Sequence, residues 1–222
     1  MRVQIYTMQT PEEAKAIVEL GVEHIGVTPS NHNLPGEVSF ETARKIFAAV
    51  GDDATKISIT VDSDLDKIVE MAEATKPDVV HICGRPLEAV PVDAVRELRR
   101  RLPGMKFMIA IPVNTETAVD LALEYEPVAD FLILDTDVSH INGIGASGET
   151  HDWNVSKRIV DETNIPVILA GGLCADNVQD AIEKVQPWAV DSLTHTNKFY
   201  EDGTFIKDID KVKAFVEAAK RG

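Results

Sequence analysis

A short apolar run, a polar turn and an amphipathic helix follow one another eight times along this chain. The expected strands are residues 3–6, 24–27, 56–61, 78–82, 106–111, 130–134, 166–170 and 188–192. Alternation of strands and helices predicts a parallel sheet, and eight such units in 222 residues are typical of a closed (β/α)8 TIM barrel of the α/β class. No linker or shift in composition marks a second domain. We therefore expect residues 1–222 to form a single (β/α)8 barrel domain.

The seventh unit carries the clearest local signal. Residues 166–170 are apolar on both faces, as in a strand buried on both sides, and Gly171 and Gly172 end the run. Asp176 or Asn177 can cap the helix that follows. A turn without side chains lets backbone N–H groups approach a ligand, and a helix N-terminus favours an anion. The diglycine turn indicates either a phosphate site or a tight connection without a ligand.

Polar side chains at the C-terminal strand ends form the expected site, because barrel active sites lie at that face. Asp135 closes the apolar sixth strand, where a buried carboxyl can act as a general acid or base. The alternative is an aspartate that only caps a loop. The other strand-end candidates are Tyr6, His81 and Cys83 for catalysis, and Asp191, Thr194 and His195 for binding the substrate or its phosphate.

A glycine-rich loop at residues 142–148 follows the sixth strand. Gly145, Ser147 and Gly148 offer N–H groups and a hydroxyl just before a helix begins, which favours a second phosphate-facing or lid loop. A flexible connection is the alternative, although a purely structural link seldom has this length.

Metal binding was considered for the residues around strand four. His81 and Cys83 lie two apart and point to the same side of a strand. Together with His32, His195 and Asp135 they supply the ligand types of a catalytic metal, but their spacing matches no known metal signature. We expect no cofactor and no metal, with a metal-assisted enzyme kept as an alternative.

The composition excludes some partners. A net charge of −15 argues against binding to nucleic acid or to an anionic membrane, since both require a basic surface. Cys83 and Cys174 are the only cysteines, which suits a reducing compartment. No apolar signal segment or apolar run of ~18 residues is present, so a cytoplasmic location is expected.

Several motifs together resemble one enzyme family. Residues 166–178 read Pro-Val-Ile-Leu-Ala-Gly-Gly-Leu-Cys-Ala-Asp-Asn-Val, residues 132–136 read Leu-Ile-Leu-Asp-Thr, and residues 145–153 contain the Gly-x-Ser-Gly and Asp-Trp pattern. These match the seventh strand, sixth strand and glycine loop of phosphoribosylanthranilate isomerases, the barrel enzymes of tryptophan biosynthesis. The likeness covers nearly the whole chain.

The resemblance implies an Amadori rearrangement, which turns an aldose amine phosphate into a ketose. In the family an acid opens the sugar ring and a base removes the C2 proton. The family's acid corresponds to Asp135, and its phosphate-binding glycines correspond to Gly145, Gly148, Gly171 and Gly172. The resemblance implies a small phosphorylated metabolite as ligand. The resemblance does not decide whether the protein is a monomer or a homodimer.

Other family features are replaced. The Lys-Ile-Cys-Gly motif that supplies the basic cysteine reads Gln-Ile-Tyr-Thr, so Tyr6 stands at the base position with a phenol pKa ordinarily near ~10. The arginine of the second loop becomes Gly36. The strand-four Gln-Leu-His-Gly reads His-Ile-Cys-Gly at residues 81–84, and the Ser-Gly after strand eight becomes Leu-Thr-His-Thr at residues 193–196.

Three functions follow from this pattern. The first is an aldose–ketose isomerase with Asp135 as acid and a base among Tyr6, His81 and Cys83, acting on phosphoribosylanthranilate or on another phosphorylated sugar derivative. The second is an epimerase, an aldolase or a metal-assisted enzyme that uses the same scaffold. The third is a non-catalytic binder of phosphorylated ligands.

Overall fold

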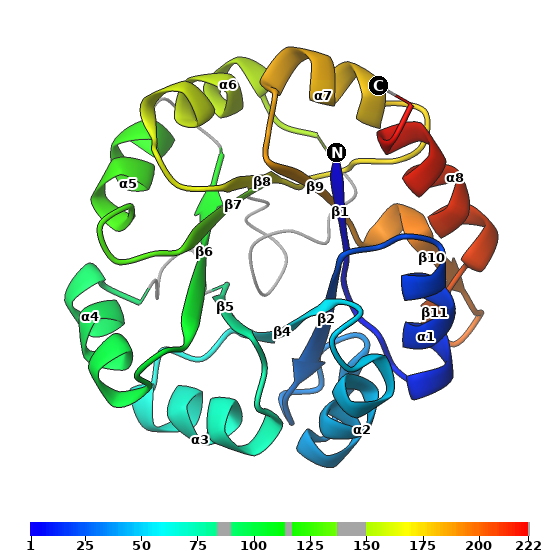
Figure 1. Cartoon of the computed structure of the whole chain (residues 1–222), viewed down its shortest axis with the longest axis horizontal. Coiled ribbons are helices and arrows are strands. Elements are labelled where there is room, and N and C mark those ends of the chain that lie inside the picture. Colours follow the sequence, from blue (N-terminus) through cyan, green and yellow to red (C-terminus); the bar gives the residue numbers. More distant parts are fainter. Residues whose placement is uncertain (84–89, 114–116, 137–149, 222) are drawn as a thin grey trace.

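A computed structural model describes residues 1–83, 90–113, 117–136 and 150–221. Within these residues, eight parallel strands close into a barrel in the order β1-β9-β8-β7-β6-β5-β4-β2, because β1 pairs with both β9 and β2. Figure 1 looks down this barrel and shows the helices arranged in a ring around it. The predicted (β/α)8 fold is confirmed.

The elements lie within one or two residues of their expected ranges. The barrel strands are β1 (Arg2–Ile5), β2 (His24–Pro29), β4 (Thr55–Thr60), β5 (Val79–Ile82), β6 (Lys106–Pro112), β7 (Phe131–Asp135), β8 (Val167–Leu169) and β9 (Ala189–Ser192). The helices are α1 (Pro11–Glu19), α2 (Phe40–Val50), α3 (Leu65–Thr75), α4 (Val92–Arg101), α5 (Thr117–Tyr125), α6 (Trp153–Glu162), α7 (Val178–Val185) and α8 (Ile209–Ala219).

Short polar side chains begin many of the helices. Backbone N–H groups of the first turn donate to the side chains of Thr10, Ser39, Asp64, Asp152 and Asp208. In α7, Asn177 stands at the N-cap position as predicted, but its side chain forms no capping bond to the helix. Its amide instead binds the preceding turn.

Two apolar clusters divide the core. Alternate strand residues point into the barrel and pack together, among them Ile57, Val79, Met108, Ile133 and Ile168. The intervening residues pack outward against the helices. The polar residues that interrupt the inner cluster are therefore the ones that can face a ligand.

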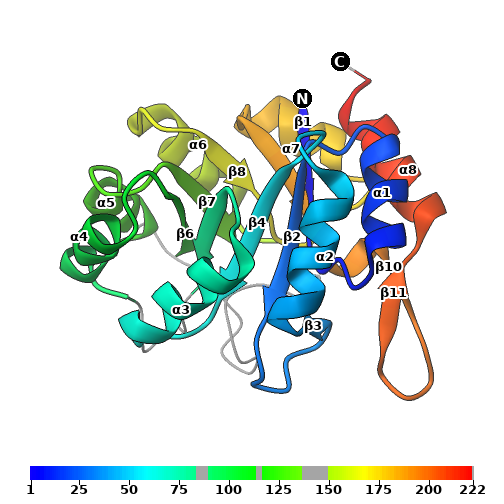
Figure 2. The ribbon, with the colours of Figure 1, turned by 60° about the horizontal axis from the view of Figure 1, so that its bottom comes forward.

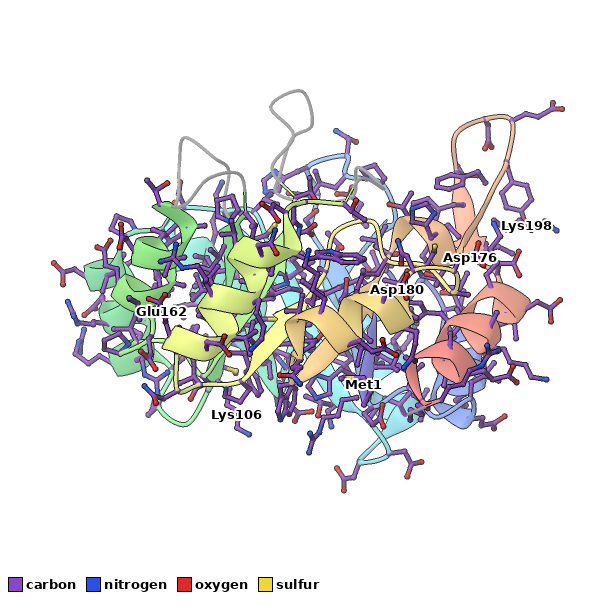
Figure 3. All side chains as sticks on the ribbon, turned by 90° about the horizontal axis from the view of Figure 1, so that it is seen from above. Met1, Lys106, Glu162, Asp176, Asp180 and Lys198 are labelled. Atoms are coloured by element: carbon purple, nitrogen blue, oxygen red, sulfur yellow. The ribbon has the colours of Figure 1, made fainter. Side chains whose placement is uncertain are left out.

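Two short additions were not predicted from the sequence. The strand β3 (Glu37–Val38) pairs with β2, and the 3₁₀ helix η1 (Thr194–Thr196) leads into an antiparallel hairpin of β10 (Asn197–Phe199) and β11 (Phe205–Lys207). Figure 2 shows this hairpin projecting beside α1 and α8. In Figure 3, Met1 and Lys106 lie on the side of the barrel where the strands begin, and Lys198 of the hairpin lies toward the opposite side.

Candidate active site

Two carboxyl groups occupy the same level of the barrel interior. The register pairs Leu134 with Leu169 and Leu169 with Val190, so the next residues, Asp135, Ala170 and Asp191, form one row. Strands separated by one neighbour lie roughly 10 Å apart. The intervening strand places only a methyl group between the two carboxyls, and the charge of Asp135 contributes to the raised pKa of Asp191.

Asp191 is buried and held in a fixed orientation. Gln4 Nε2 donates to Asp191 Oδ1 at 3.1 Å, and Gln4 Oε1 lies 3.3 Å from His24 Nδ1. Burial raises the pKa of Asp191 to about 8, with a further contribution from the charge of Asp135. Sequence reasoning missed the role of Gln4, because the contact joins residues 187 positions apart.

Asp135 stays partly accessible at the end of β7. Its surroundings are nevertheless apolar, and desolvation raises its pKa to about 7, opposed by a 2.7 Å bond from the Thr136 backbone N–H. At neutral pH the pair of carboxyls therefore holds about one proton. Asp191 has the higher pKa and holds the larger share of that proton, and the form with the proton on Asp135 is less populated.

Tyr6 lies in the inner cluster of the barrel. Its ring lies over Gly26, where an added Cβ would come 2.0 Å from Tyr6 Cδ1. Its hydroxyl and His81 Nδ1 share a hydrogen bond at 2.6 Å, the hydroxyl also donates to Met108 Sδ at 3.8 Å, and both side chains are buried. His81 Nε2 has no hydrogen-bond partner among the described residues.

Burial works against Tyr6 and His81 as a base. It raises the pKa of the Tyr6 phenol well above its ordinary value and lowers the pKa of His81 to about 3. His81 Nδ1 is already engaged in the hydrogen bond with the Tyr6 hydroxyl. Cys83, buried in the inner cluster on the same side of β5, stays a predicted candidate.

The backbone beside Tyr6 adopts an uncommon conformation. Thr7 has a φ of 63°, which is unfavourable for a β-branched residue, and its hydroxyl donates to the Tyr6 carbonyl at 2.7 Å. The family motif has glycine at this position, so this chain keeps the turn without the residue that suits it.

The diglycine turn has the geometry expected of an anion site. Gly171 and Gly172 have φ values of 81° and 63°, and a Cβ on Gly171 would lie 2.5 Å from Thr136 Oγ1. Asn177 fixes the turn, since its Oδ1 accepts from the Cys174 N–H at 2.8 Å and its Nδ2 donates to the Gly172 carbonyl at 3.0 Å. The backbone here can approach a ligand closely.

His151 lies against the same turn and was not among the predicted site residues. Its Nδ1 is 3.2 Å from Thr136 Oγ1, and its Nε2 is 2.7 Å from Ser156 Oγ. Burial lowers the pKa of His151 to about 4, so it is neutral near pH 7. It positions Thr136 beside the glycines rather than supplying charge.

The turn after β9 lies next to the diglycine turn. Ser192 Oγ donates to the Leu173 carbonyl at 2.9 Å, which joins the two turns. The predicted residues Thr194 and His195 belong to η1 within this second turn. Gly145, Ser147 and Gly148 lie outside the described residues, so their predicted role stays a prediction.

Comparison with known proteins agrees with this geometry. The family model for N-(5'-phosphoribosyl)anthranilate (PRA) isomerase matches residues 3–218. The chain belongs to the PRA isomerase family. It is 31% identical to the enzyme of Methanocella arvoryzae over 219 residues, covering 99% of this chain and 98% of the relative. It is 32% identical to the enzyme of Haloferax volcanii, covering 99% and 93%.

Solved PRA isomerase structures share the fold. The Thermotoga maritima enzyme superposes with a TM-score of 0.83 at 28% identity, covering 99% of this chain and 98% of that chain. Another PRA isomerase, 26% identical with a TM-score of 0.80, was solved with reduced 1-(o-carboxyphenylamino)-1-deoxyribulose 5-phosphate. Membership confirms the predicted enzyme class, an intramolecular oxidoreductase that interconverts aldose and ketose.

The histidines and acids do not converge on a metal. Among the described residues, no three His, Cys, Asp or Glu side chains gather closely enough to hold an ion. His32, considered as a ligand, instead has its Nε2 3.0 Å from Asp62 Oδ2. No helix of the described residues is long and apolar enough to cross a membrane.

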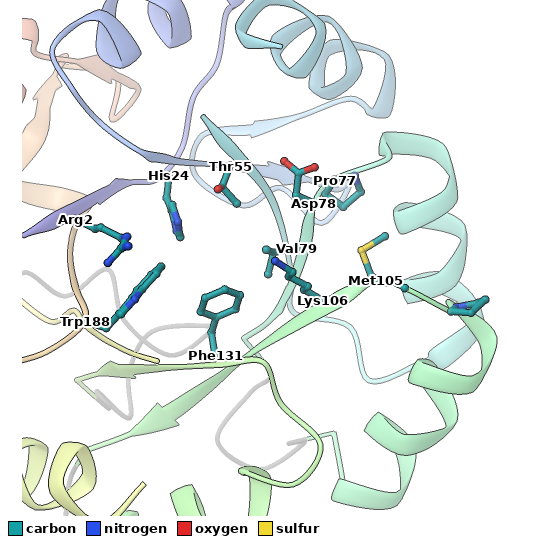
Figure 4. A pocket seen from close by; sticks show the side chains of 12 residues that line it. Arg2, His24, Thr55, Pro77, Asp78, Val79, Met105, Lys106, Phe131 and Trp188 are labelled. Atoms are coloured by element: carbon teal, nitrogen blue, oxygen red, sulfur yellow. The ribbon is translucent and has the colours of Figure 1, made fainter. Parts of the chain in front are cut away.

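A separate cavity of about 750 Å³ opens at the N-terminal end of the barrel. Its wall is formed by the aromatic rings of His24, Phe131 and Trp188, with the Arg2 guanidinium 4.4 Å from the Trp188 ring centre (Figure 4). It lies beyond the layer of Gln4 and His24, away from the carboxyl pair. Nothing in the PRA isomerase site requires it.

Proposed function

We propose that this chain is an acid–base isomerase of a phosphorylated aldose amine, with phosphoribosylanthranilate as its first substrate to test. The observation that carries the proposal is the row of Asp135, Ala170 and Asp191 beside the diglycine turn. The pair supplies a proton donor and an acceptor, and the turn supplies a site for the phosphate.

The proposed chemistry divides between the two carboxyls. Protonated Asp135 donates to the ring oxygen, the C1–O bond breaks, and the amine nitrogen forms a double bond to C1. The Asp191 carboxylate then removes the C2 proton, and the electron pair moves through C1 to the nitrogen. The resulting enol becomes the ketose by proton transfer. Each carboxyl has a pKa near the working pH, as general acid–base catalysis requires.

In this proposal Asp191, a residue of the barrel interior, takes the role of the basic cysteine of the family. The Tyr6 hydroxyl is engaged with His81, whereas Asp191 Oδ2 takes no hydrogen bond from any described residue. The charge on Asp191 is also stabilised by the Gln4 amide. Asp191 has the higher pKa of the pair, so the form with Asp135 protonated and Asp191 ionised is the less populated one, but in that form Asp191 is the stronger proton acceptor.

The test is turnover of freshly generated phosphoribosylanthranilate, measured with and without a chelator. We expect Asp135→Asn and Asp191→Asn each to lower kcat by at least ~10²-fold with the fold intact, and Cys83→Ser to have little effect. Turnover by Asp191→Asn at the wild-type rate would remove Asp191 from the mechanism. Loss of turnover in Cys83→Ser alone would move the base to β5.

A second substrate is favoured by one further observation. Gly36 replaces the family's arginine, and the Phe205 ring occupies the space beside it, since an added Cβ would lie 2.7 Å from Phe205 Cζ. No side chain at this position can hold an aromatic carboxylate. If phosphoribosylanthranilate is inert, a panel of other phosphorylated aldose amines and sugar phosphates is the next assay. Binding without turnover across that panel would favour a non-catalytic role.

A further inference from the structure

The cavity at the N-terminal end of the barrel has the size of a ligand site. Its volume of about 750 Å³ lies within the range of ~300–1,000 Å³ that small-molecule sites occupy in proteins. Its lining includes the first residue of each of β1, β2, β4, β5, β6 and β7. Because barrel active sites lie at the opposite face, a ligand bound here is distinct from the substrate.

Three aromatic rings form one wall of this cavity. The ring centres of His24 and Trp188 are 5.3 Å apart, and those of Phe131 and Trp188 are 5.5 Å apart. The rings of His24 and Phe131 meet edge to face at 6.3 Å. Mutual packing fixes these rings before a ligand arrives, so a planar aromatic group can bind against them with little further ordering of side chains.

Two cations stand at the same opening. Arg2 and Lys106 are exposed, and neither forms an ion pair with a carboxylate of the described residues. Figure 4 shows the aromatic rings between these two side chains, and the Arg2 guanidinium lies 4.4 Å from the Trp188 ring centre. Burial lowers the pKa of His24 to about 4, and the charges of Arg2 and Lys106 lower it further, which places both cations near that ring.

The acids closest to this opening are already paired with other lysines. Asp78, which lines the cavity, lies 3.2 Å from Lys56 Nζ, and Glu23 lies 2.7 Å from Lys220 Nζ. The chain has 37 acidic and 22 basic side chains, so a basic side chain seldom lacks an acid to pair with. Two cations that share one cavity and have no carboxylate partner among the described residues indicate a site for an anion.

We propose that this cavity binds a small aromatic carboxylate, with its ring against Trp188 and Phe131 and its carboxylate between Arg2 and Lys106. Each part of the ligand matches one part of the wall. An anion without a ring would leave the aromatic surface in water, and a neutral ring would leave both cations unpaired. The inference does not rest on the proposed isomerase reaction, because the site lies at the other face of the barrel and its ligand undergoes no chemistry.

The experiment measures benzoate binding by calorimetry near neutral pH, where benzoate is an anion. For the wild-type chain we expect a Kd of ~1 mM or below. Two analogues separate the two contacts. Benzamide keeps the ring and lacks the charge, and cyclohexanecarboxylate keeps the charge and lacks the aromatic ring. Each should bind at least about threefold more weakly than benzoate.

Variants of the lining residues locate the site. Arg2→Gln and Lys106→Gln should each weaken benzoate binding about threefold to fivefold, and the double variant should weaken it about tenfold or more. Lys184→Gln removes an exposed lysine of α7, outside the cavity, and should bind like wild type. Trp188→Leu should abolish the preference for benzoate over cyclohexanecarboxylate. Because Arg2 and Lys106 are exposed, thermal melting should show an intact fold in both of their variants.

Absence of benzoate binding by wild type at ~10 mM would overturn the proposal. Equal affinity in wild type and in the double variant of Arg2 and Lys106 would also overturn it, since benzoate would then bind elsewhere. Equal affinity for benzoate and benzamide would show that no anion is recognised, with the same consequence. If Trp188→Leu does not fold, the two cation variants decide the question. Turnover is not a readout here, so the result is independent of whether the isomerase assay succeeds.

Discussion

Replacement of Tyr6 by phenylalanine separates a structural role from a catalytic one. The change removes the hydroxyl that shares a 2.6 Å hydrogen bond with His81 Nδ1 and leaves the ring in place over Gly26. Because His81 Nε2 has no described partner either, neither tautomer of the imidazole can compensate. An unsatisfied buried polar group costs about 1–3 kcal/mol, so the free energy of unfolding should fall by about 2 kcal/mol.

Urea denaturation and thermal melting measure this loss. For a chain of this size a change of 2 kcal/mol lowers Tm by roughly 4–8 °C. Turnover should remain within about tenfold of wild type, since the proposed base is Asp191. The double variant Tyr6→Phe, His81→Leu removes both polar partners and should recover part of the lost stability. Unchanged stability together with a kcat reduced by more than ~10²-fold would refute the reasoning and identify Tyr6 as catalytic.

Three further predictions concern the same barrel face. Gly26→Ala should destabilise the wild-type chain by about 3 kcal/mol, because its Cβ would lie 2.0 Å from the Tyr6 ring. In a Tyr6→Cys background, unfolding curves should show a much smaller loss of stability from the same change. The pKa values of Asp135 and Asp191 are raised to about 7 and about 8, so the contribution of these two carboxyls to stability is fully present below pH ~4, where both are protonated, and is lost as pH rises through these values. In urea titrations, the free energy of unfolding of Asp191→Asn should therefore fall by a few kcal/mol less than that of wild type between pH 5 and pH 9. Parallel curves of unfolding free energy against pH for the two proteins would contradict the assignment of the raised pKa to Asp191. Gly171→Ala should weaken sulfate binding at least tenfold in calorimetry, since a Cβ there meets Thr136 Oγ1 at 2.5 Å with φ at 81°, and unchanged affinity would place the anion elsewhere.

The barrel itself could be predicted because its signal is local. Apolar runs such as residues 131–134 and amphipathic helices such as 40–50 repeat at regular spacing, and parallel strands place their C-terminal ends at one face. Asp135 and the diglycine turn could be located for the same reason, since each directly ends a strand. The hairpin of β10 and β11 was missed, because its strands are three residues long and carry little pattern.

The sequence alone determined the architecture, the family and the position of the candidate acid Asp135. Tertiary structure decided what the inward-facing side chains can do. Tyr6 and His81 are 75 residues apart and Gln4 and Asp191 are 187 apart, yet each pair shares a hydrogen bond inside the barrel. Lys207 has the sequence environment of a surface lysine and is nevertheless buried. Burial and cross-strand partners set protonation, and neither is encoded in the local pattern of residues.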